Sequence, residues 1–271
     1  MKDRSIPIII AVVLIGMIAL GTGFRRVENT GDEWYANLHI GDRIEADEPQ
    51  APEEPDSPVV GRTATEVVEL GTATRAEVRL AQPVGELKVR GASGPLMDAQ
   101  FDTKPKRWTP EVDYRVDGEV GELTVRQSEF DPFAEGDTRN NWDVALDTGT
   151  PMDLVIERGA GEADLLIGDL LLLSARIVNG AGETTIDLTG GRELDDDVEI
   201  DVIGGVGAMR LALPNGVPVR VTIDQGIGEV TVDGLSEDGG AWVNDAYDDD
   251  RPAYEIRVKQ GIGEVSIELG E

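Results

Sequence analysis

The feature that most constrains the fold of this chain is a short unit that recurs from residue 74 onward. Each unit is an alternating apolar and polar segment, a Gly-x-Gly-Glu corner, and a second alternating segment. One such unit cannot bury enough apolar surface alone, so stability must come from stacking neighbouring units. The clearest copies are RGAGEADLLI (158–167), NGAGETTIDL (179–188), GGVGAMRLAL (204–213), QGIGEVTV (225–232) and QGIGEVSIEL (260–269), and looser ones are PVGELKV (83–89) and EVGELTV (119–125).

The glycines of these units are predicted structural corners. The first glycine of each clear copy lies at 159, 180, 205, 226 and 261, at intervals of 21, 25, 21 and 35 residues. The last interval therefore contains an insertion. The predicted corner residues are Gly159, Gly161, Gly180, Gly182, Gly205, Gly207, Gly226, Gly228, Gly261 and Gly263.

The apolar residues change parity across each corner. In the copy at 226, Val219, Val221 and Ile223 alternate with polar residues, which is typical of a half-buried strand. After the glycines the apolar positions are Val230 and Val232, with the opposite parity. One residue is therefore used in turning the chain, and glycine suits that place because it adopts positive φ without steric cost.

Two all-β architectures fit this pattern. In a β-solenoid of about seven units, the glycines form an arc and each strand pairs with its equivalent in the next unit. In a stack of hairpins, the glycines close a tight antiparallel turn. The near-constant interval favours the solenoid, because each rung must match its neighbour.

The chain resembles the toast-rack family over residues 70–271, with the related C-terminal domain of LiaF-type envelope-stress proteins and β-repeat adhesin families. The resemblance rests on VRLAQPVGELKVRGASGPLMDAQFDTKPKRWTPEVDYRV, on NNWDVALDTGTPMDLVIERGAGEADLLIGDL, and on the repeated corner in register with both. It implies the fold and no catalytic residues. LiaF-type proteins restrain a membrane histidine kinase but carry several membrane segments, whereas one is evident here.

The N-terminus is expected to meet the membrane. An apolar run from Ile6 to Phe24 is long enough to nearly cross a bilayer as a helix. It is either an uncleaved single-pass anchor or a signal peptide, and the absence of an Ala-x-Ala site favours the anchor. We expect an anchor (1–26), an acidic Pro-rich stalk (27–69) and an extracytoplasmic β-repeat domain (70–271).

Charge and composition exclude several classes of protein. The formal net charge of −30 repels nucleic acid and anionic headgroups. Cysteine is absent, so disulfides, thiolate metal sites and catalytic thiols are impossible. The glycine motifs continue into strands and not helices, which argues against nucleotide binding. No cofactor is expected.

Three groups of residues are candidate sites. The first is the corner row Glu86, Glu122, Glu162, Glu183, Glu229 and Glu264, interrupted at Ala208, which could bind cations or cap corner N–H groups. The second is the pair of acidic runs Asp195, Asp196, Asp197 and Asp248, Asp249, Asp250, which are weak candidates for Ca²⁺ or else solvated loops. The third is the insertion 236–252, whose Trp242 and Tyr247 could mark an interaction loop or pack over the repeat edge.

These observations predict a non-catalytic, membrane-tethered scaffold or sensor that contacts a protein partner in the cell envelope. The alternatives are an adhesin-like or glycan-binding surface module and, more remotely, a carbohydrate-active enzyme that uses paired carboxylates. The chain ends at Gly270-Glu271, just after a strand, and that terminal strand could pair with another copy.

Overall fold

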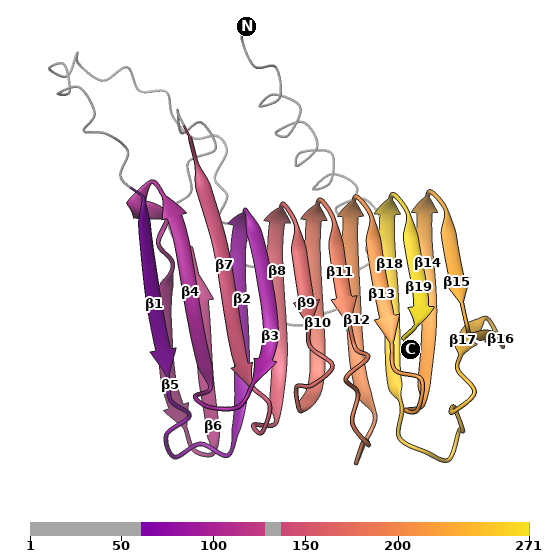
Figure 1. Cartoon of the computed structure of the whole chain (residues 1–271). Coiled ribbons are helices and arrows are strands. Elements are labelled where there is room, and N and C mark those ends of the chain that lie inside the picture. Colours follow the sequence, from indigo (N-terminus) through magenta and orange to yellow (C-terminus); the bar gives the residue numbers. More distant parts are fainter. Residues whose placement is uncertain (1–60, 128–136, 271) are drawn as a thin grey trace, which may run out of the picture.

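The computed structural model describes residues 61–127 and 137–270, which form two β-sheets joined through the glycine corners (Figure 1). The N-terminal segments expected as anchor and stalk up to residue 60 lie outside these ranges. Within them the single helical element is a 3-10 turn at Lys106–Trp108, and no helix is long and apolar enough to span a membrane.

Each sheet is open, with the following strand orders in the described residues. The nine-stranded sheet runs β1 (Arg62–Val68), β4 (Met97–Lys104), β7 (Arg139–Asp147), β3 (Glu86–Ala92), β9 (Ala163–Leu166), β11 (Thr184–Asp187), β13 (Met209–Leu213), β19 (Val265–Leu269) and β15 (Val230–Asp233). The ten-stranded sheet runs β16 (Ser236–Asp238), β17 (Ala241–Val243), β14 (Val219–Ile227), β18 (Tyr254–Ile262), β12 (Val198–Val206), β10 (Leu172–Ala181), β8 (Met152–Ala160), β2 (Arg75–Val84), β6 (Val120–Arg126) and β5 (Glu111–Asp117).

Two strands joined by a glycine corner form what we call a rung, with one strand in each sheet. The rungs are β2–β3, β8–β9, β10–β11, β12–β13, β18–β19 and β14–β15, in spatial order. Equivalent strands of adjacent rungs pair in parallel and in register, as Ile177 does with Ile156 and with Val202. The two strands of one rung do not pair with each other, so a hairpin turn at the glycines is wrong.

The spatial order of the rungs departs from the order along the chain. The rung that comes last in the sequence, β18–β19, lies in space between β12–β13 and β14–β15, where it is drawn yellow between orange strands (Figure 1). A solenoid whose units follow one another in sequence is therefore not what forms at this end. The C-terminal strand β19 is not an edge to which another copy could add, because it has β13 on one side and β15 on the other, and self-association of the protein stays a prediction.

One predicted repeat copy is not a rung. Residues 119–125 belong to an antiparallel hairpin of β5 and β6, which turns at Gly118 with φ 61°. Gly121 lies inside β6 and Glu122 pairs across the hairpin with Arg115. The apolar alternation of this segment does mark a strand. The chain turns at Gly118 and not at Gly121, so Glu122 lies outside the glutamate row.

The β domain also begins earlier than predicted. Strand β1 (Arg62–Val68) falls within the stretch assigned to the stalk, yet it pairs antiparallel with β4 over its whole length. Only Ala64 on this strand is fully buried, so its sequence has little of the apolar alternation that identifies a strand.

The core lies between the two sheets and is built from stripes that cross the rungs. Because pairing is in register, one inward position of every rung falls in the same stripe. One stripe of the nine-stranded sheet consists of Val89, Leu165, Ile186, Leu211 and Ile267, each at most 1% exposed. Each such side chain contributes roughly 1.5–3 kcal/mol when buried, so stacking stabilises what single rungs cannot.

The corners require glycine for two separate reasons. The second glycine of each motif has positive φ, for example 143° at Gly207. The first glycine does not, but a Cβ on Gly205 would collide with the carbonyl oxygen of Gly180 in the neighbouring rung. The corners stack so closely that a backbone carbonyl of one rung lies where a Cβ atom of the next rung would be.

We predict that Gly207→Ala lowers the free energy of unfolding by more than about 2 kcal/mol, because it combines positive φ with a collision against the Gly182 carbonyl. Urea unfolding measures this. Gly216→Ala is the matched control, since nothing lies within 4 Å of its Cβ position, and it should change stability by less than about 0.5 kcal/mol. Equal effects of the two substitutions would contradict the stacking argument.

Deleting residues 254–271 should remove the rung that separates β12–β13 from β14–β15. We expect the backbone amides of residues 219–233 to lose their protection against hydrogen exchange. Both strands of the rung β14–β15 pair with the deleted strands β18 and β19. Protection in β8 and β10, which are distant from the deletion, should persist. Unchanged protection of 219–233 would show that β14–β15 can close onto β12–β13 directly.

Candidate functional site

A ladder of polar side chains lines the inside of the corners. The residue before each first corner position faces inward, and these residues are in register from rung to rung: Gln82, Arg158, Asn179, Gly204, Gln260 and Gln225. Donors of four of them bind the carbonyl of a second corner glycine, in their own rung or in the adjacent one: Arg158, Asn179, Gln225 and Gln260. Gln260 Nε2, for example, donates to the Gly207 carbonyl at 2.8 Å.

Arg158 is the charged member of this ladder and is only 1% exposed. Its guanidinium donates to the carbonyls of Gly85 and Gly161 and, through Nε, to Gln82 Oε1 at 3.2 Å. Burial lowers the pKa of Arg158 to about 10, an effect that the Glu162 carboxylate opposes. The side chain therefore stays charged at neutral pH, and we assign it to the corner structure.

The glutamate row follows the outside of the corners. Register places Glu86, Glu162, Glu183, Ala208, Glu264 and Glu229 side by side in that order. Their backbone carbonyls accept hydrogen bonds from the backbone of the neighbouring rung, as Glu162 does from Leu87 N at 2.9 Å. In the described residues of this row, only Glu183 has a side-chain hydrogen bond, which it accepts from Arg210. A hollow of about 300 Å³ lies beside Glu86, Glu162 and Glu183.

No group of three or more His, Asp or Glu side chains that could hold a metal ion occurs in residues 61–127 and 137–270. The acidic runs instead shape loops. Asp197 accepts a hydrogen bond from Ala253 N at 3.0 Å, and Asp248 accepts one from Asp250 N at 3.1 Å. Asp197 therefore joins its loop to the segment that precedes β18, and Asp248 organises its own turn, while cation binding by the runs 195–197 and 248–250 stays a prediction.

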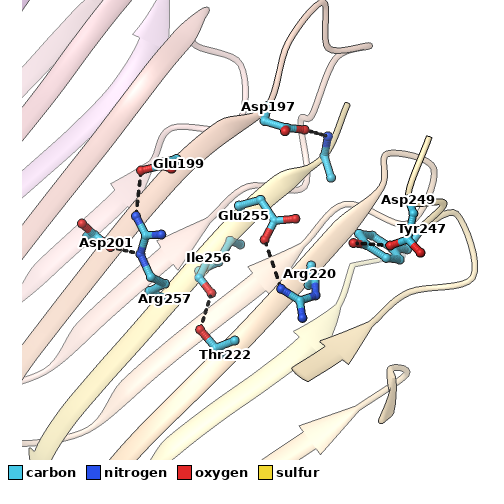
Figure 2. A network of polar contacts seen from close by, with 11 residues as sticks. Asp197, Glu199, Asp201, Arg220, Thr222, Tyr247, Asp249, Glu255, Ile256 and Arg257 are labelled. Carbon is cyan, nitrogen blue, oxygen red and sulfur yellow. Dashed lines mark hydrogen bonds and ion pairs between the residues drawn. The ribbon is translucent and has the colours of Figure 1, made fainter. Parts of the chain in front are cut away.

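Arginines join neighbouring rungs across the outer faces of both sheets. Figure 2 shows Arg257 on β18, which donates to Asp201 and Glu199 on β12, each at 2.7 Å. Hydrogen bonds to these two carboxylates raise the pKa of Arg257. On the last rung Arg220 reaches back to Glu255 at 3.6 Å (Figure 2). The same cross-rung pairing joins Arg79 to Glu157 and Arg210 to Glu183, and Arg90 of the first rung pairs with Asp143 on the neighbouring strand β7.

We call the stack of six rungs the rack. It ends at the rung β14–β15, whose inner face is incompletely covered. Along β14 the exposure of inward positions rises from Val219 and Val221, both fully buried, to Ile227 at 69%. Val230 at the start of β15 is 41% exposed, although its equivalent in the adjacent rung, Val265, is fully buried. The stripes of the core therefore reach the surface in this half of the rung.

The insertion between β15 and β18 covers the other half. Its hairpin of β16 and β17 pairs with β14 only at Arg220↔Val243 and Val221↔Trp242. Trp242 is half-buried against the core, and Tyr247 is half-buried with its hydroxyl donating to Asp249 Oδ1 at 3.1 Å (Figure 2). The predicted interaction loop thus packs over the repeat edge, and its role as a contact site stays a prediction.

A larger hollow, of about 530 Å³, opens at the loop ends of the rungs, opposite the corners. Its lining includes Thr189, Leu194, Asn215 and Pro252, with one carboxylate, Glu193, and one guanidinium, Arg251. This composition does not supply the two facing carboxylates that glycoside cleavage needs.

These features define a two-sheet rack of β units whose corners stack through glycine. A family model described as the N-terminal domain of toast_rack matches residues 57–212, more than half of the chain. The chain therefore belongs to the toast-rack family.

Solved structures that align with the chain are described as a cell adhesion protein and as adhesins. A candidate cell adhesion protein of Clostridium sporogenes is 24% identical, with a TM-score of 0.73, and covers 78% of this chain and 100% of its own. A candidate adhesin of Parabacteroides distasonis is 11% identical over 79% of this chain and 98% of its own, with a TM-score of 0.25. No curated protein matches the chain.

Sequence reasoning found the corners but missed the polar ladder. The signal was present, because Gln, Asn or Arg precedes the corner in the copies at 82, 158, 179, 225 and 260. The exception, Gly204, is explained by its neighbour: a Cβ there would collide with Gln260 Oε1.

Two substitutions separate the hydrogen bonds of Arg158 from its charge. Arg158→Gln should keep a donor at the corner, as Gln82 and Gln260 do, and change stability by less than about 1 kcal/mol. Arg158→Met leaves corner carbonyls unsatisfied and should lower the free energy of unfolding by about 1–3 kcal/mol. Chemical denaturation measures the free energy of unfolding of the two variants and so distinguishes the role of the hydrogen bonds from that of the charge. If the methionine variant equals or exceeds the glutamine variant in stability, the ladder has no structural role.

Proposed function

We propose that this protein is a non-catalytic module, tethered to the membrane in the cell envelope, that acts by contact with another protein. The observation that carries the proposal is the exposed half of the last rung. There the apolar interior of the rack, represented by Ile227 and Val230, reaches the surface beside a strand edge. Exposed aliphatic clusters and unpaired strand edges are typical of interaction sites.

The N-terminal sequence supports the tether. The apolar run Ile6–Phe24 and the acidic, Pro-rich residues 43–60 suit an anchor followed by a spacer. Together they would hold the rack away from the bilayer. A net charge of −30 would also keep the rack off anionic headgroups and leave its faces accessible.

An adhesin-like or glycan-binding surface module is the second candidate. It is favoured by the fold shared with the candidate cell adhesion protein of Clostridium sporogenes, at 24% identity. Both candidates place the rack outside the cytoplasm. They differ in the partner, because an envelope protein lies on the same cell whereas an adhesin binds glycan or another cell.

Thiol labelling tests the shared location. The chain has no cysteine, so Ser236→Cys on the exposed strand β16 provides one accessible thiol. We expect a membrane-impermeant maleimide to label this variant in intact cells, and extraction at alkaline pH to leave the protein in the membrane fraction.

Leu165→Cys is the matched control, because Leu165 is fully buried and its thiol should react only after denaturation. Labelling of Ser236→Cys that requires cell lysis would place the rack in the cytoplasm and refute both candidates. Release of the protein by alkaline extraction would refute the tether alone.

A further inference from the structure

We infer that the corner half of the last rung is a docking site for an extended segment of a partner protein that carries alternating aliphatic and basic residues. The segment would add to β14–β15 as one more rung. The inference rests on the proposed function, since it names the partner of the same exposed surface. Three properties of the site carry it: its shape, its backbone and its charge.

The shape of the site is a rung with one side missing. Among residues 61–127 and 137–270, no strand covers the inward positions of β14 beyond Val221, since β17 ends its pairing there. Ile223 and Val232 are half-buried, and Ile227 and Val230 are exposed. In the adjacent rung the equivalents of Ile223, Val230 and Val232 are fully buried, and the equivalent of Ile227, Ile262, is 38% exposed against 69% for Ile227. A segment with aliphatic side chains at alternate positions would complete the stripes in the same way.

The backbone of the site is an unpaired parallel edge. Within the described residues β15 is the last strand of its sheet. The Ile227 and Glu229 carbonyls accept inward hydrogen bonds from Gly263 N and Val265 N, at 2.8 and 2.9 Å. Because direction alternates along a strand, the N–H and C=O groups of Val230 and Val232 face outward. Addition of a strand satisfies such groups and is a common mode of peptide recognition.

The charge of the site indicates the partner's chemistry. Elsewhere an arginine of one rung pairs with a carboxylate of the next, as Arg257 does with Asp201 (Figure 2). On the last rung Asp224, Glu229 and Asp233 are exposed and have no ion pair in the described part of the chain. A strand added at this edge would lie beside all three carboxylates. The partner segment should therefore carry Lys or Arg beside its aliphatic residues.

A second copy of this chain fits the site less well than a basic segment. Pairing β15 with its equivalent in another copy would bring Asp224, Glu229 and Asp233 of both chains together. It would also join two molecules that each carry a formal charge of −30. Like charges placed opposite one another on paired strands are destabilising.

The rack provides its own probe. Rung β18–β19 already stacks on β14–β15 in register, with Lys259 beside Asp224 and Glu264 beside Glu229. A synthetic peptide copying residues 256–267, with Glu264→Lys, presents the same corner and aliphatic pattern with basic residues at both places. Its binding to the full-length protein in zwitterionic lipid nanodiscs can be followed by fluorescence anisotropy. A peptide of the same composition in shuffled order controls for attraction by charge alone.

We expect one peptide to bind per chain, and Ile227→Asp to weaken binding by about tenfold or more, as loss of a central contact does. Val67→Asp is the matched control, because Val67 is 55% exposed on β1 at the opposite end of the rack and should leave binding unchanged. Asp224→Lys, on the polar outer face of β14, should also weaken binding. Thermal unfolding verifies that each variant is folded.

Four results would overturn the inference. They are absence of binding, equal binding of the shuffled peptide, equal affinity of the Ile227→Asp variant, and a wild-type dimer in sedimentation that Ile227→Asp dissociates. The last would assign the site to a second copy. None of them bears on the cellular location, which the Ser236→Cys labelling measures separately.

Discussion

The structure depends on the close approach of neighbouring corners. A carbonyl oxygen of one rung lies where a Cβ of the next would be, as the Gly182 oxygen does against Gly207. This contact allows strands of both sheets to remain in hydrogen-bonding register through a sharp turn. It leaves the turning carbonyls without ladder partners, so the polar ladder of Gln82, Arg158, Asn179 and Gln260 becomes necessary. The glycine spacing, the buried polar row and the apolar stripes are consequences of one geometric constraint.

The repeat pattern predicted the all-β class, the corners and the inward positions, because each is a local property with a fixed period. The order of the rungs in space is not local and could not be predicted. The connection 214–218 from β13 to β14 is as long as 167–171 from β9 to β10, yet it passes the place of a whole rung. A connection that skips one rung must cross two interstrand spacings, about 10 Å in all. Five residues can span this distance as well as they span a single spacing. Length therefore carries no signal of the skipped position.

The candidate site was less predictable than the fold. Residues 119–125 have the motif of a corner, but the flanking Gly118 permits a tight turn that closes β5 on β6 first. The sequence left open whether Trp242 marks an interaction loop or packs over the repeat edge, because the decision depends on its pairing with β14, which buries it in part. Ile227 and Val230 looked like core in sequence because they share the period of every other rung. Their exposure follows only from being last in space, a property of the assembled rack.

The intercalated rung also affects how the chain can mature during synthesis. Residues 219–233 emerge before residues 254–269, but their permanent neighbour is the later segment. A nascent chain that stacks β14 directly on β12 must reopen that sheet to admit β18. One that waits must keep an aliphatic strand unpaired until translation ends. Either route makes closure of the rack a late, non-local event. A chain truncated before residue 254 would therefore either stack β14 on β12 or leave the aliphatic rows of both rungs exposed.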